Sequence, residues 1–103
     1  MPKARLPMDP VPPAPLAPDE AAFITRTVRR FYGSDAVIRN YGPDPKRLML
    51  HVETDVEPAL EVHECLGLLM CDLARDYIGL EVTKRGRRVR GSAKIAYRQG
   101  VII

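Results

Sequence analysis

Two neighbouring side chains of the segment 47–56 are of the types used in catalysis and metal binding. His51 and Glu53 alternate there with apolar residues at the period of a strand, so we expect both on its outer face. A histidine beside a carboxylate is part of a metal site or of an acid–base pair, but each needs a further converging group, and the sequence shows none. We therefore predict a solvated pair, with no catalytic residue, metal or cofactor.

A second cluster, at residues 63–65, combines histidine, glutamate and cysteine within a helical pattern. His63 and Cys65 are two positions apart, which directs them about 200° apart on a helix and separates a nucleophile from its base. His63 and Glu64 lack the second histidine of a zinc-protease helix. The chain has no phosphate loop or cofactor fingerprint, so we expect a protein that is not an enzyme.

Positive charge is concentrated at the C-terminal end of the chain. Residues 82–103 contain seven lysines and arginines and no acidic residue, whereas residues 1–81 contain nine basic and thirteen acidic residues. The modest overall charge of +3 therefore conceals a cationic end on an acidic body. Such an asymmetry indicates a partner of negative charge.

The same segment alternates apolar and cationic residues from Arg88 onward, which predicts a strand with one apolar and one basic face. With residues 78–83 and a turn at 84–87, this strand would form a C-terminal β-hairpin. Side chains on one strand face lie roughly 6 to 7 Å apart, close to the spacing of phosphates along a nucleic-acid strand. We predict that a polyanion is bound by Arg85, Arg87, Arg88, Arg90, Lys94 and Arg98.

Contacts to the phosphate backbone are favoured over base recognition, because few aromatic side chains are available for stacking. Tyr97 is expected to point inward, and only Tyr41 is expected to point outward. The alternative is a solvated sheet face on which the cations pair with acidic residues of neighbouring strands, namely Glu53, Asp55 and Glu81.

The elements that must position these residues follow from periodicity and turn chemistry. A helix is predicted over 19–32, with acidic residues at its start, arginines near its end and Gly33 to close it. Strands are predicted over 36–41 and 47–56, joined by the Gly-Pro-Asp-Pro turn of residues 42–45. A long helix over 58–77 follows.

The long predicted helix is apolar over more than half of its circumference. One sheet face cannot bury so wide a surface, which indicates either contacts on two sides or self-association. Gly67 would let a neighbouring backbone approach closely. The residues we assign to a homodimer interface are Leu66, Leu68, Met70 and Leu73.

The N-terminal segment 1–18 contains seven of the ten prolines, which predicts a disordered or semi-rigid tail before a single domain at 19–103. Its PxxP spacings arise by chance in any proline-rich stretch. Cys65 and Cys71 are expected as buried free thiols. With no secretory signal and no apolar run long enough for a membrane span, we expect a soluble, cytoplasmic protein with no membrane contact.

The element order helix, strand, strand, helix, strand, strand predicts an α+β fold. We expect a two-layer sandwich in which both helices pack on one face of a mainly antiparallel four-stranded sheet, while the other face is open. Two functions fit this reading. The first is a small binding module for nucleic-acid phosphates; the second is a homodimeric adaptor or accessory protein whose basic hairpin docks an acidic protein partner.

Overall fold

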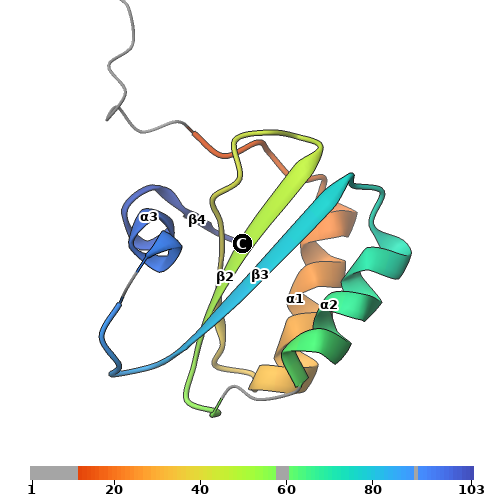
Figure 1. Cartoon of the computed structure of the whole chain (residues 1–103). Helices are drawn as coiled ribbons and strands as arrows, with labels where there is room; N and C mark the ends of the chain where they lie inside the picture. Colours follow the sequence, from red (N-terminus) through yellow and green to blue (C-terminus); the bar gives the residue numbers. More distant parts are fainter. Residues whose placement is uncertain (1–11, 58–60, 90) are drawn as a thin grey trace, which may run out of the picture.

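The computed structural model describes residues 12–57, 61–89 and 91–103 and shows a four-stranded sheet with three helices (Figure 1). The prediction of an α+β fold with a four-stranded sheet is confirmed. The elements, in chain order, are α1 Pro18–Tyr32, β1 Val37–Asn40, β2 Arg47–Thr54, α2 Glu61–Asp72, β3 Tyr77–Lys84, α3 Ser92–Gln99 and β4 Val101–Ile102.

The sheet has the strand order β3-β2-β1-β4 and mixed pairing. β1 is antiparallel to both β2 and β4, whereas β2 and β3 run parallel, with Leu50 opposite Leu80. The parallel pair arises because α2 carries the chain back along the sheet before β3 begins, as in any strand–helix–strand crossover. The expectation of a mainly antiparallel sheet missed this crossover.

The main core lies between the sheet and the two longer helices, which Figure 1 shows on the same side of the sheet. Alternate residues of β2 point into it, and Leu50 and Val52 are completely buried. They meet Ile24 and Val28 of α1 and Leu69 of α2. The helical and strand periods read from the sequence therefore identify this core correctly.

The C-terminal segment differs from its predicted structure. Residues 92–99 form α3 instead of a strand, and the predicted basic hairpin does not form. Ala93 and Ala96 are buried, and Tyr97 lies next to them on the same helix face, which is a helical spacing. On their own, the apolar residues at odd positions of this segment indicate a strand instead. Gly91, with a positive φ of 58°, begins the helix, and Gly100 ends it.

α3 lies on the side of the sheet opposite α1 and α2 (Figure 1). It contacts β1 and β2, so this part of the second sheet face is covered and not open as predicted. The two-residue strand β4 follows and pairs with β1, with Arg39 opposite Ile102. The end of the chain thus returns to the edge of the sheet farthest from β3.

The last part of the proline-rich segment is attached to the domain. Ala14 donates its N–H to the carbonyl of Gly42 at 2.8 Å, and the Asn40 side-chain amide donates to the carbonyl of Ala14 at 2.8 Å. Pro18 occupies the first turn of α1, where its missing N–H costs nothing. Residues 1–11 of the predicted disordered tail lie outside the described residues.

Candidate functional site

Arg85, the first of the predicted polyanion-binding residues, is engaged within the domain. Its guanidinium contacts Glu53 at 3.2 Å and Asp55 at 2.6 Å, and donates to the carbonyl of Asp35 at 3.1 Å. These partners include two of the three acidic residues that the alternative reading assigned to the cations. Arg85 is therefore held across the ends of β2 and β3.

Arg87 shares the carboxylate of Glu57 with Lys84. The Arg87 Nη2 atom lies 2.8 Å and the Lys84 Nζ atom 3.3 Å from the Glu57 oxygens. All three side chains are exposed, so each pair contributes only about 0.2–1 kcal/mol. The parallel register, with Thr54 opposite Lys84, brings Glu57 to this corner.

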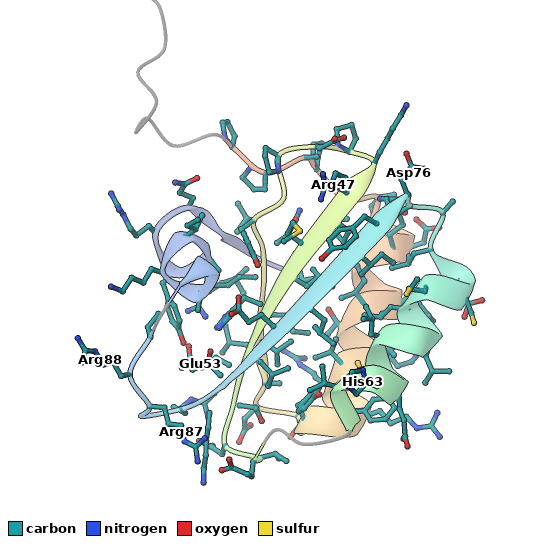
Figure 2. All side chains as sticks on the ribbon, viewed as in Figure 1. Arg47, Glu53, His63, Asp76, Arg87 and Arg88 are labelled. Carbon is teal, nitrogen blue, oxygen red and sulfur yellow. The ribbon has the colours of Figure 1, made fainter. Side chains whose placement is uncertain are left out.

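The remaining described cations are free of ion pairs within the described part of the chain. Arg88, Lys94 and Arg98 are exposed, and Figure 2 shows Arg88 pointing away from the sheet. Lys94 and Arg98 are one turn apart on the outer face of α3, a rise of about 6 Å. We refer to these three exposed cations as the α3 basic surface; Arg88 precedes the helix, and Lys94 and Arg98 lie on it. Arg90, also predicted to bind, lies outside the described residues.

Glu53 is the centre of a polar network beneath α3. It accepts hydrogen bonds from Tyr97 Oη at 2.8 Å, Arg39 Nη1 at 3.1 Å and Arg85 Nε at 3.2 Å. Partial burial raises the pKa of Glu53, but the bonds from Tyr97, Arg39 and Arg85 outweigh it and leave that pKa below its ordinary value. Glu53 is therefore an ionised structural acceptor and not a proton donor.

His51 is completely buried, so the prediction of a solvated residue is wrong. Its Nε2 atom lies 2.9 Å from the hydroxyl of Thr83, and its ring centroid lies 5.1 Å from that of Tyr97. Burial, followed by the charge of Arg39, lowers the pKa of His51. Tyr97 of α3 covers this position, which the prediction of a strand at 88–101 could not anticipate.

The two aromatic side chains considered for base stacking are both engaged in the domain. Arg39 lies over the ring of Tyr97, with its guanidinium carbon 4.3 Å from the centroid. Burial and the hydrogen bond to Glu53 raise the pKa of Tyr97. Tyr41, predicted to point outward, is only 7% exposed. Tyr97, predicted to point inward, is 37% exposed, although its ring and hydroxyl contact Arg39 and Glu53.

The four residues assigned to a dimer interface divide into two pairs. Leu73 belongs to the core and Leu66 packs against it, whereas Leu68 is 42% and Met70 58% exposed. Leu68 lines two neighbouring hollows of about 590 and 490 Å³ between α1 and α2, which also share Arg30. The prediction that α2 is apolar beyond its core-facing side is supported at Leu68 and Met70.

The two cysteines lie in different environments. Cys65 is buried in the core, and burial raises the pKa of its thiol to about 11. Cys71, predicted to be buried, is exposed beside the larger hollow. Both are free thiols, as expected.

The described residues contain no group of three or more histidine, cysteine, aspartate or glutamate side chains placed to hold a metal ion. No helix among them has both the length and the apolar character needed to cross a bilayer.

Comparison with known proteins returned no relative for this chain. No protein-family model matches it, and no curated protein or solved structure is significantly similar to it.

Proposed function

We propose that this protein is a non-enzymatic binding module that contacts the phosphates of a nucleic acid through the α3 basic surface. The observation that carries the proposal is that, in the described part of the chain, some C-terminal cations form ion pairs within the domain and others do not. Lys84, Arg85 and Arg87 are matched by carboxylates of the domain, whereas Arg88, Lys94 and Arg98 are exposed without such partners among the described residues.

The spacing of these cations supports backbone contact. Lys94 and Arg98 are separated by about 6 Å along α3, near the distance between successive phosphates, so the helix offers the ladder that the predicted strand would have offered. Arg90 adds a fourth positive charge in the same sequence segment. Each contacted phosphate releases counterions, so binding would be strongly salt-dependent.

The engaged aromatic rings favour binding that is independent of base sequence. Tyr97 contacts Arg39 and His51 and donates a hydrogen bond to Glu53, which restricts the surface that its ring can offer to a base. Contacts would therefore fall on phosphate and sugar, which position a nucleic acid without reading it. We propose a cytoplasmic location for this activity.

The test is fluorescence anisotropy of labelled single- and double-stranded DNA and RNA across a salt series. We expect log affinity for duplex DNA to fall against log salt with a slope of about −3, for three to four contacted phosphates. The triple variant Arg88→Ala/Lys94→Ala/Arg98→Ala should lose this binding.

A matched control removes the same positive charge from the other side of the sheet. The variant Arg26→Ala/Arg29→Ala/Arg30→Ala changes three exposed arginines of α1 and should retain most of the affinity. Equal losses in both triple variants would mean that net charge alone, and not the α3 basic surface, attracts nucleic acid. A wild-type protein that fails to bind even at low salt would rule out the proposal.

An adaptor for an acidic protein partner is the second candidate. The exposed Leu68 and Met70, beside the hollows between α1 and α2, favour it, because apolar groups of this kind form the centre of protein interfaces. In this case the same cations would dock the acidic partner. An adaptor would show no affinity for nucleic acid at low salt and would lose partner binding on Leu68→Glu/Met70→Glu.

A further inference from the structure

β3 is an eight-residue strand at one edge of the sheet. Among the described residues it pairs as a strand only with β2, and in Figure 1 no ribbon crosses in front of it. Edge strands are usually short, or carry a bulge, a charged side chain or a proline. These features prevent their free N–H and C=O groups from pairing with other strands. β3 contains no proline.

The outward backbone groups of β3 belong to its even-numbered residues. The N–H groups of Tyr77 and Arg85 point toward β2, where they bond to the carbonyls of Lys46 and Thr54. Backbone groups alternate in direction along a strand, so Ile78, Leu80 and Val82 direct theirs away from β2. These residues offer a ladder to a further strand.

We propose that β3 pairs antiparallel with β3 of a second copy of this chain, joining two sheets into one of eight strands. The two-fold axis passes through Leu80, which lies opposite the partner's Leu80. Ile78 then lies opposite the partner's Val82. Ile78, Leu80 and Val82 exchange backbone hydrogen bonds with the partner in this register, about six in total.

Charge complementarity selects this register. Asp76, which directly precedes β3, comes to lie near the partner's Lys84 at the end of that strand, and the symmetry forms this pair twice. Glu81 lies opposite the partner's Gly79. A shift that centred the pairing on Glu81 would set two like charges directly against each other, which destabilises a sheet.

In this register the apolar faces of the two sheets lie on the same side of the joined sheet. Directly opposed residues of an antiparallel pair share a face, and here an even residue always meets an even one. The even side chains of β3 point toward the main core, where Ile78 is buried and Leu80 and Val82 pack against the cluster while remaining partly exposed. The pairing therefore continues the apolar face from one copy to the other.

The first measurement is sedimentation velocity of the full chain over a concentration series. We expect a dimer with twice the 11.5 kDa chain mass that dissociates on dilution. A wild-type chain that stays monomeric at every concentration tested would overturn the proposal.

Charge-swap variants test the register. Asp76→Lys and Lys84→Asp each replace two attractive pairs with two repulsive ones, and each should weaken dimerisation by about tenfold or more. The double variant Asp76→Lys/Lys84→Asp restores opposite charges and should recover the dimer. Lys84→Asp also removes the contact with Glu57, so loss of the dimer in this single variant could reflect misfolding. Recovery of the dimer in the double variant would show that the loss came from the pairing between copies. Single variants that dimerise as well as wild type would contradict the register.

A control variant addresses the α2 surface. Leu68→Glu/Met70→Glu places charge on the exposed side of α2 and should leave the dimer intact. Loss of the dimer in this variant, with unchanged behaviour of the charge swaps, would move the interface from β3 to α2 and overturn the proposal.

Discussion

His51 shows how the environment of a single residue reverses its expected chemistry. On an exposed strand face a histidine beside Glu53 would be protonated below its ordinary pKa of 6.5. Here it is completely buried, its Nδ1 atom has no hydrogen-bond partner among the described residues, and burial lowers its pKa. The neutral ring is therefore part of the packing under α3.

This burial predicts a loss of stability in mild acid. Because the folded pKa is lower than the unfolded one, the unfolded chain binds the proton first as pH falls below about 6.5. The free energy of unfolding should then fall by at most about 1.4 kcal/mol for each pH unit until the folded pKa is reached. Urea unfolding at pH 7.5 and pH 5.5 measures this.

The control for His51 is the uncharged variant His51→Gln, which keeps a polar group near Thr83. Its free energy of unfolding should change less than that of the wild type over the same pH interval. The carboxylates Glu20 and Glu53 do not confuse the result, because their pKa values are lowered and their effect begins at more acidic pH. Parallel pH dependence of the two proteins would contradict the assignment.

At the scale of elements, an ion pair links the start of α1 to the loop between α2 and β3. Arg75 contacts the Glu20 carboxylate through two atoms, at 2.8 and 2.9 Å, and both side chains are partly buried. Glu20 also accepts a bond from the Ala17 N–H, which caps the helix. The bond from Arg75 is the main cause of the lowered pKa of Glu20.

Arg75→Ala should lower the free energy of unfolding by about 1 to 2 kcal/mol, since a two-point arginine–carboxylate contact is stronger than an ordinary surface pair. Lysine offers one donor group, so the free energy of unfolding of Arg75→Lys should lie between that of Arg75→Ala and that of the wild type. The contribution should be present at pH 7 and disappear as pH falls through the lowered pKa of Glu20. Arg29→Ala on the exposed side of α1 is a control that should change little.

At the scale of the whole molecule, the two proposals combine. Pairing through β3 gives the strand order 4-1-2-3-3-2-1-4, with β4 at both outer ends. α3 contacts β1 and β2 on the side away from α1 and α2, so both α3 basic surfaces would lie on one face of the dimer. The dimer would then be a bivalent binder of a long polyanion.

Bivalency predicts that affinity depends on nucleic-acid length. A duplex long enough to reach both surfaces should bind the dimer at least about tenfold more tightly than a short one, whereas the monomeric charge variants should show no such difference. The double variant Asp76→Lys/Lys84→Asp should recover the dependence of affinity on duplex length. Anisotropy with duplexes of increasing length measures the effect, and a length dependence that persists in the monomers would contradict it.

Elements whose signals are local can be read from the residues of one segment. The helical period of residues 18–32, the alternation of residues 47–54 and the breaker residues 42–45 place α1, β2 and the turn before it, because each pattern lies within one segment. The concentration of positive charge after residue 81 is likewise a property of the chain alone.

Which strands pair and which side chains are covered depends instead on how distant segments pack together. The parallel pairing of β3, the placement of α3 over His51 and the matching of Arg85 with Glu53 all join segments at least 30 residues apart. In residues 92–99 the same apolar pattern satisfies a strand and a helix, and the burial of Ala93 and Ala96 against the sheet selects the helix. Long-range packing, which local periodicity does not encode, therefore separates the paired cations from the free ones.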